Sequence, residues 1–307
     1  MSILEVQNLS ISFQQYGSGL KRQTLDVMSN LSIELEEGEI LAVVGASGSG
    51  KSLLAHAILG ILPENAGTTG TIQYDGEELT DDKLVTLRGK EIALIPQSVN
   101  FLDPLMQVGK QVRHSVGEGD AFAAQRAVFE RYHLNPQVEK MYPFQLSGGM
   151  ARRTLLSTAA VSGAKVIIAD EPTPGLDEVV IQEALSNFRE FANAGCAVML
   201  ITHDIESALK IADKIAVFYA GTVVEIASVH DFTGKGEKLR HPYSKALWNA
   251  LPQNDFIPIP GAQPQLNDLP PGCLFAPRCP LATKECTEAR PDMRELREGK
   301  VRCIDAT

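Results

Sequence analysis

Cysteine is scarce over most of this chain: the first 272 residues contain Cys196 alone, and the other four cysteines lie in the last 35 residues. This scarcity excludes a disulfide framework as the basis of the fold. Long apolar runs are also missing, since "KVIIAD" and "KIAVFYA" fall far short of the ~20 residues needed to span a bilayer. The start "MSILEVQNLSISF" has no basic stretch followed by an apolar one, so it predicts no secretory signal. We therefore expect a cytoplasmic protein.

Basic residues are fewer than acidic ones: the chain has 28 Lys and Arg, 38 Asp and Glu, and a formal net charge of −10. Sequence-independent binding to nucleic acid depends on many cationic contacts to phosphates, so we expect no nucleic-acid partner. The 307 residues are enough for one large domain and a smaller appendage.

The pattern of apolar residues divides the chain into four stretches. Short alternating runs with Gly, Asp or Asn between them predict a β-rich first third. Helical spacing predicts a helical insertion at about 99–164, and from Lys165 short apolar runs alternate with helices at 178–194 and 204–212, as in parallel α/β units. A Pro-rich segment follows one amphipathic helix after Thr233. We predict an α/β domain over 1–233 and an extension over 234–307.

The segment "GASGSGKS" fits the pattern G-x-x-x-x-G-K-[ST] and stands between the apolar run "EILAVV" and the helical run "SLLAHAILGIL". Such a loop closes backbone N–H groups around phosphate oxygens, while Lys51 reaches the β and γ phosphates and Ser52 ligates Mg²⁺. It predicts an ATP-binding P-loop. The predicted nucleotide-binding residues of this loop are Gly45, Ser47, Gly48, Ser49, Gly50, Lys51 and Ser52.

An acidic pair follows the apolar run "KVIIAD". We expect Asp170 to organise Mg²⁺ and its waters, and Glu171 to polarise the water that attacks the γ phosphate. An acidic pair of this kind, taken alone, is more often a helix cap or a solvated turn. Combined with the P-loop, it indicates ATP hydrolysis.

Between these two segments lies "YPFQLSGGMARR", and here the chain resembles the ATP-binding subunits of ABC transporters, whose signature reads LSGGQ or LSGGM. The resemblance implies a P-loop ATPase fold with a β-rich N-terminal part, a helical insertion and head-to-tail pairing with a second ATPase. Ser147, Gly148 and Gly149 would then hold the γ phosphate of the partner's ATP. Pairing explains why Lys51 and Ser147, 96 positions apart, both belong to phosphate-binding motifs.

Further site residues are implied by the same resemblance. Gln97 matches the Q-loop glutamine, which senses Mg²⁺ and water, and His203 matches the switch histidine at the γ phosphate. Asp177 matches the D-loop aspartate at the dimer interface. For the aromatic residue that stacks on adenine, Phe13 is favoured over Tyr16.

The sequence departs from the family pattern in two places. Ala151, Arg152 and Arg153 follow the signature and put Arg where Gln is common, and Pro174-Gly175 replaces the usual Thr-Ala of the D-loop.

The C-terminal segments "HPYSKALWNALP" and "LPPGCLFAPRCP" resemble the oligopeptide, dipeptide and nickel importer ATPases. That resemblance implies import of peptides, nickel or a metallophore. It also implies a different partner ATPase, two permease subunits and a solute-binding protein, with this chain at the cytoplasmic face of the membrane. The alternative is a non-transport ABC ATPase such as those of phosphonate C–P lyase systems, which lack the cysteine tail.

The four clustered cysteines are Cys273, Cys279, Cys286 and Cys303, with the spacing C-x5-C-x6-C-x16-C. Their spacing leaves the metal open, and their setting, poor in apolar side chains, indicates that metal–thiolate bonds fold the tail. The family resemblance implies a [4Fe–4S] cluster, with zinc and free thiols as alternatives. We expect loss of the metal to loosen the tail and to spare a distant P-loop. Cys196, inside the run "GCAVMLIT", is interpreted as a small buried apolar residue.

Overall fold

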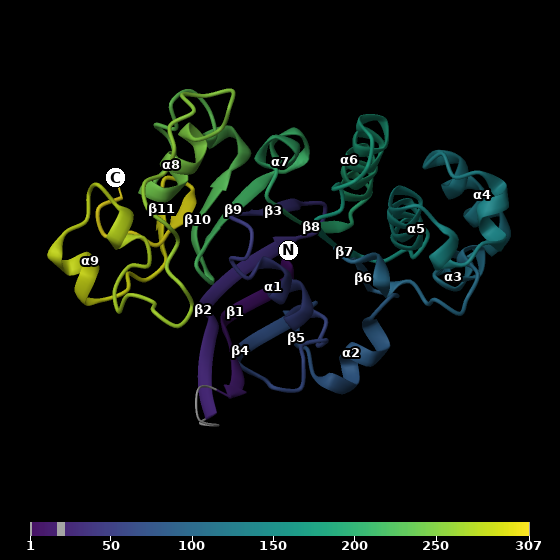
Figure 1. Cartoon of the computed structure of the whole chain (residues 1–307), viewed down its shortest axis with the longest axis horizontal. Coiled ribbons are helices and arrows are strands. Elements are labelled where there is room, and N and C mark those ends of the chain that lie inside the picture. The colour runs from purple at the N-terminus through teal and green to yellow at the C-terminus, as the bar shows by residue number, and fades with distance from the viewer. Residues whose placement is uncertain (1, 17–21, 307) are drawn as a thin grey trace.

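A computed structural model describes residues 2–16 and 22–306 and contains two β-sheets with helices around them (Figure 1). The larger sheet has the strand order β11-β12-β10-β9-β3-β8-β7-β6, and its central strands from β9 to β6 run parallel. Its strands are β3 (Ile40–Val44), β6 (Ile92–Ile95), β7 (Val166–Asp170), β8 (Ala197–Thr202), β9 (Lys214–Tyr219), β10 (Thr222–Ser228), β11 (Arg294–Leu296) and β12 (Gly299–Val301). Every residue of β3, β7 and β8 is buried, as their continuous apolar sequences predict.

The smaller sheet is antiparallel and has the order β2-β1-β4-β5. Its strands are β1 (Ser2–Tyr16), β2 (Arg22–Glu36), β4 (Ala66–Tyr74) and β5 (Glu77–Glu78). Leu4 and Ile11 of β1 share one apolar core with Leu54 of α1 (Lys51–Ile58) and Val43 of β3. Helix α1 therefore packs against both sheets.

The helices form two groups beyond the sheets. Helices α6 (Glu178–Asn193) and α7 (Ile205–Ile211) pack on the larger sheet, and α2 (Asp81–Leu87) follows β5. Helices α3 (Val108–His114), α4 (Ala121–Arg131) and α5 (Gly148–Ala160) lie together at one side of the molecule (Figure 1). Between residues 99 and 164, all of which the structure describes, there is no strand, so this region is helical as predicted.

The C-terminal extension is not a separate appendage. It contains α8 (Pro242–Asn249) and α9 (Lys284–Glu288), and its β11–β12 hairpin continues the larger sheet by pairing with β10. Tyr243, Trp248 and Phe275 belong to the same apolar core as Val217 of β9. The expectation that the tail lacks a core of its own missed this packing, because its few apolar residues are buried against strands far away in sequence.

A buried charge network fastens the start of the extension. The Glu225 carboxylate accepts hydrogen bonds from the backbone N–H groups of Arg240 and His241, both at 2.8 Å. The Arg240 guanidinium lies 3.3 Å from Glu225 and 2.8 Å from Asp231. The side chains of Glu225 and Arg240 are 0% and 2% exposed, so this ion pair is shielded from water.

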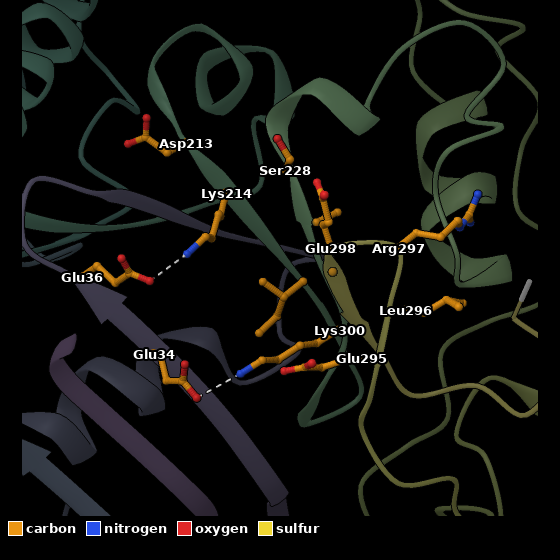
Figure 2. A pocket seen from close by; sticks show the side chains of 13 residues that line it. Glu34, Glu36, Asp213, Lys214, Ser228, Glu295, Leu296, Arg297, Glu298 and Lys300 are labelled. Atoms are coloured by element: carbon orange, nitrogen blue, oxygen red, sulfur yellow. Dashed lines mark hydrogen bonds and ion pairs between the residues drawn. The ribbon is translucent and has the colours of Figure 1, made fainter. Parts of the chain in front are cut away.

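A hollow of about 650 Å³ separates β2 from the β11–β12 hairpin (Figure 2). Two ion pairs cross it: Lys300 lies 2.9 Å from Glu34, and Lys214 lies 3.3 Å from Glu36. In contrast to the Glu225–Arg240 pair, all four side chains are at least one-third exposed. No residue predicted to bind nucleotide lines this hollow.

None of the helices in the described part of the chain is long and apolar enough to cross a membrane.

Candidate functional site

The P-loop lies where β3 ends and α1 begins, and two of its glycines are required there by geometry. A Cβ atom on Gly45 would lie 2.3 Å from the carbonyl oxygen of Phe218, so no larger residue fits without a shift of the backbone. Gly50 has a φ of 102°, a left-handed conformation that L-residues rarely adopt, and it directly precedes α1. The loop is therefore held against the end of β9 and turned so that the helix begins at Lys51.

The side chain of Lys51 is buried in this loop, with 5% of its surface exposed. Its Nζ atom donates hydrogen bonds to the carbonyl oxygens of Gly45 and Ala46, both at 2.9 Å. Burial lowers the pKa of Lys51, while the charges of Glu171 and Asp170 act in the opposite direction. The loop thus positions a cation beside two acids.

A pocket of about 260 Å³ lies over the P-loop. Gln97, from the segment after β6, and Glu171, after β7, complete its wall. Seven of the predicted site residues line it together: Ser47, Gly48, Gly50, Lys51, Ser52, Gln97 and Glu171. The structure therefore brings residues from three separate motifs to one place. Ser49 is 1% exposed and its hydroxyl has no hydrogen-bond partner among the described residues.

Asp170 is the last residue of β7 and is 2% exposed. Burial raises its pKa, whereas a hydrogen bond with the side chain of Ser52 lowers it. The Oδ1 atom of Asp170 is buried and has no hydrogen-bond partner in the described structure. A hard cation that prefers oxygen ligands suits this pair, because Mg²⁺ is commonly held by one or two protein oxygens together with water and phosphate.

Glu171 is buried and has an unusual backbone conformation, with a φ of 46°. A left-handed conformation costs a residue other than Gly about 1–2 kcal/mol. Its N–H donates to the carbonyl oxygen of Ile201 at 2.9 Å, and its carboxylate lies 2.8 Å from Nδ1 of His203. Its carbonyl oxygen accepts a hydrogen bond from Nη1 of Arg152 at 2.8 Å. Contacts from two other elements therefore fix this residue.

His203 follows β8, the neighbour of β7, and its side chain is 59% exposed. The parallel strands bring His203 and Glu171 together at one edge of the sheet. Both residues were predicted to act at the γ phosphate, and their contact agrees with that prediction without testing their roles.

The signature segment, residues 146–150, lies apart from the lining of the P-loop pocket. Ser147 caps α5 by accepting a hydrogen bond from the Met150 N–H at 3.3 Å. A Cβ atom on Gly149 would lie 3.5 Å from the carbonyl oxygen of Gly175, so the signature lies beside the D-loop. Asp177 caps α6 through the N–H of Val180. Gly148 begins α5 and likewise does not line the P-loop pocket.

The two aromatic residues proposed to stack on adenine lie in β1. Phe13 is partly buried and pairs with Leu25 and Ala66 on the neighbouring strands. Tyr16 is 66% exposed. Neither lines the P-loop pocket, so their role stays a prediction.

The four C-terminal cysteines come together. Cys273, Cys279, Cys286 and Cys303 line one narrow pocket, and the N–H of Cys273 donates to the carbonyl oxygen of Cys286 at 2.7 Å. Burial raises the pKa of Cys273, Cys279 and Cys303. Within residues 2–16 and 22–306, no group of three or more His, Cys, Asp or Glu side chains has the arrangement of a metal site. The donor set suits a soft metal, but the arrangement of a bound metal is not formed.

The position and burial of Cys196 differ from those predicted from the sequence. It precedes β8 instead of lying inside the strand, and it is half-buried. Its thiol lies 3.3 Å from the carbonyl oxygen of Ala164, and burial raises its pKa to about 12. The thiol is therefore uncharged and packed, but at the edge of the core.

The P-loop is not distant from the cysteine tail, and the expectation that it is was wrong. Burial raises the pKa of Tyr243 to about 12, and its hydroxyl lies close enough to the backbone of Ala46 for that backbone to act on the pKa in the opposite direction. The Tyr243 ring lies 4.4 Å from that of Tyr219 and 5.3 Å from that of Phe275, between their centroids. Phe275 lines the cysteine pocket together with His241. Tyr243 and Phe275 thus connect the P-loop to the cysteine pocket.

The roles of these connecting residues were not predicted from the sequence. Tyr243 and His241 stand in the segment "HPY", which served only to indicate a family, and Arg152 was noted only as a departure from a pattern. No local signal in the sequence shows that Tyr243 reaches Ala46 or that Arg152 reaches Glu171.

Two family profiles match this chain. The profile described as "ABC transporter" covers residues 28–174, and "Oligopeptide/dipeptide transporter, C-terminal region" covers residues 224–286. The match of the second profile includes Tyr243 and the first three cysteines of the tail.

Curated relatives cover nearly the whole chain. The oligopeptide transport ATP-binding protein OppD of Escherichia coli is 33% identical over 98% of this chain and 97% of its own length. The dipeptide transport ATP-binding protein DppD of Bacillus subtilis is 34% identical over 94% of this chain and 90% of its own length. OppD of Mycobacterium bovis is 36% identical over 98% of this chain, which spans about half, 52%, of that relative.

Solved structures agree on the fold. A dimeric ATP-binding cassette bound to ADP and Pi in a post-hydrolysis state has a TM-score of 0.65 and 23% identity, and covers 74% of this chain and 98% of its own.

Proposed function

This chain belongs to the ABC transporter ATP-binding subunits that carry the oligopeptide/dipeptide transporter C-terminal region, and we propose that it hydrolyses ATP to power peptide import. The main support for the proposal is that Lys51, Ser52, Gln97 and Glu171 line the same pocket. Such a pocket combines phosphate binding, metal binding and activation of water, which together are what ATP hydrolysis requires.

Binding of ATP begins at the P-loop. The backbone N–H groups at the start of α1 and the positive end of the helix dipole attract phosphate oxygens. Lys51 exchanges the carbonyl oxygens of Gly45 and Ala46 for oxygens of the β and γ phosphates. The adenine base stacks on Phe13.

Magnesium would be held by the hydroxyl of Ser52 and by Asp170, whose Oδ1 atom is buried without a hydrogen-bond partner in the described structure. Gln97, which lines the same pocket, would face the metal and the attacking water. When bound, Mg²⁺ neutralises negative charge on the phosphates.

Hydrolysis depends on Glu171 and His203. The Glu171 carboxylate accepts a hydrogen bond from the attacking water and so orients it toward the γ phosphorus. His203, 2.8 Å away, fixes the carboxylate and lies where it reaches the γ phosphate. Both groups act on water and phosphate without forming a covalent intermediate.

The signature supplies phosphate contacts to a second site. Ser147, Gly148 and Gly149 stand at the start of α5, outside the P-loop pocket, so we assign them to the ATP of a partner ATPase. Asp177 belongs to the same dimer interface. The partner is a different ABC ATPase in a heterodimer, and the pair works at the cytoplasmic face of the membrane under two permease subunits supplied by a solute-binding protein.

Peptides are the proposed cargo because relatives that align over nearly the whole chain are named for oligopeptide and dipeptide transport. Nickel or a metallophore is the second choice of cargo. A non-transport ATPase of the C–P lyase kind is not favoured, since the transporter C-terminal profile matches residues 224–286.

The cysteine pocket is proposed to hold a [4Fe–4S] cluster, with zinc as the alternative. Support comes from four cysteines lining one pocket in a chain that otherwise has only Cys196. Cys273, Cys279, Cys286 and Cys303 would hold the metal, which would supply thiolate bonds that join these segments of the tail.

The test of the proposed function compares ATP hydrolysis by the isolated chain with hydrolysis by the chain assembled with permease subunits and a companion ABC ATPase of the same organism. Hydrolysis by the isolated chain should be slow and should rise on assembly, because each site needs the signature of a partner. Full turnover by a verified monomer, independent of protein concentration, contradicts the composite site.

A further inference from the structure

Arg152 connects the signature helix to the carboxylate residue of the P-loop pocket. It is the fifth residue of α5, and its Nη1 atom donates to the carbonyl oxygen of Glu171 at 2.8 Å. Its side chain is half-buried. The contact joins two segments that lie 19 residues apart in sequence and belong to different motifs.

The contact acts on a backbone that is under strain. Glu171 adopts a φ of 46°, and its N–H and its carboxylate are already bound to Ile201 and His203. The carbonyl oxygen of the residue accepts its hydrogen bond from Arg152. Removing that donor frees the peptide after Glu171 to rotate toward an ordinary conformation, which would turn the carboxylate away.

The charged guanidinium of Arg152 lies near the carboxylates of Glu171 and Asp170. The groups that affect its pKa are the burial of the guanidinium, which lowers it, and the carboxylates of Glu171 and Asp170, which raise it. A half-buried cation beside these two acids is held by them as well as by the hydrogen bond.

The next residue makes a second connection. Arg153 pairs with the D-loop residue Asp177 at 3.2 Å and donates to the carbonyl oxygen of His133 at 3.3 Å. Two consecutive arginines of α5 therefore hold the segment from Glu171 to Asp177 near both of its ends. A movement of α5 is transmitted to this segment.

We propose that Arg152 is a positioning residue for ATP hydrolysis: it holds the Glu171 peptide so that the carboxylate faces the attacking water. Ser147, Gly148 and Gly149 lie at the start of α5. When they bind the partner's ATP, the Arg152 contact would therefore link that binding to the position of the Glu171 carboxylate in this chain. This inference rests on the proposed ATPase function.

The test uses the assembled transporter and three variants. Arg152→Met removes the donor and the charge while keeping a straight side chain, and Arg152→Lys keeps both. Arg126→Met is the matched control, because Arg126 is exposed on α4 and makes no side-chain hydrogen bond or ion pair with the described residues. We expect Arg152→Met to lower kcat at least tenfold with KM for ATP within twofold, Arg152→Lys to recover most of the loss, and the control to match the wild type.

A second measurement shows whether Arg152 acts through Glu171. In the Glu171→Gln background, Arg152→Met should change the residual rate less than twofold. An equal tenfold loss in that background overturns the inference, as does a wild-type kcat in Arg152→Met alone. ATP binding lost together with kcat, without recovery in Arg152→Lys, indicates a merely structural role and also overturns it. An inactive wild-type transporter contradicts the proposed function itself.

Discussion

The Nδ1 atom of His203 lies 2.8 Å from the carboxylate of Glu171, so residues that follow two neighbouring parallel strands form one pair beside the P-loop. Lys51 donates instead to the carbonyl oxygens of its own loop. The site thus separates a part that activates water from a part that binds phosphate, and the two parts should respond differently to substitution.

Lys51→Ala and Glu171→Gln distinguish the two parts. Lys51→Ala should weaken ATP binding and hydrolysis together, because it removes the cation that holds the β and γ phosphates. Glu171→Gln should bind ATP normally, hydrolyse it at least about 10²-fold more slowly and accumulate a closed dimer, because only the general base is lost. Equilibrium ATP binding and steady-state hydrolysis by the assembled complex measure both effects. Wild-type hydrolysis by Glu171→Gln would show that another group activates the water.

His203→Ala should lower kcat by about 10²-fold while ATP binding changes only a few-fold, since the histidine fixes a carboxylate that acts after binding. His230→Ala is the matched control, because His230 is exposed and lies outside the pocket. Hydrolysis under saturating ATP is the measurement. If both histidine variants keep the wild-type rate, the His203–Glu171 contact has no part in catalysis.

The buried network of the extension should dominate its stability. Glu225→Leu leaves the Arg240 charge without its fully buried partner and removes the acceptor of two backbone N–H groups, at a cost of about 3–5 kcal/mol. Lys300→Met breaks an exposed pair with Glu34 (Figure 2) and should cost less than about 1 kcal/mol. Trp248 is the only tryptophan and is buried in the extension, so its fluorescence during urea denaturation follows this region. Equal effects of the two substitutions would contradict the difference in burial.

Loss of metal from the cysteine pocket should weaken ATP binding at the P-loop. Protein purified without oxygen should be brown and contain about four irons per chain if the cluster is [4Fe–4S]. Cys279→Ser should lose the metal, shift the Trp248 fluorescence and weaken ATP binding a few-fold, because Phe275 packs on Tyr243, which contacts Ala46. Cys196→Ser, at a cysteine outside the pocket, should keep the metal. One zinc per chain would rule out iron, and a metal-free chain with alkylatable thiols would rule out both.

The sequence predicts the parts of this site that depend on local patterns. Gly45 and Gly50 can be predicted because the P-loop motif requires glycine there, and Glu171 can be predicted because it follows an apolar strand. The partners of these residues could not be predicted in the same way. Arg152 contacts Glu171 only after α5 has packed against β6, and Tyr243 comes near Ala46 only after the extension has packed on the core.

The same reason explains the error over the tail. Its composition near Cys273 is poor in apolar residues, which indicated a segment folded by metal alone. In the structure Phe275 and Trp248 are buried in the core of the whole molecule, and β12 pairs with β10. Packing against strands that are distant in the sequence produces no regular pattern of apolar residues in the segment itself, so it could not be predicted from that segment.

The most direct test of the account is peptide uptake by cells of the source organism that lack this chain. Uptake of a labelled tripeptide should be lost on deletion, restored by the wild-type chain and not restored by Glu171→Gln expressed at the same level. Uptake that continues without the chain, or that Glu171→Gln restores in full, would contradict the claim that ATP hydrolysis at this site powers peptide import.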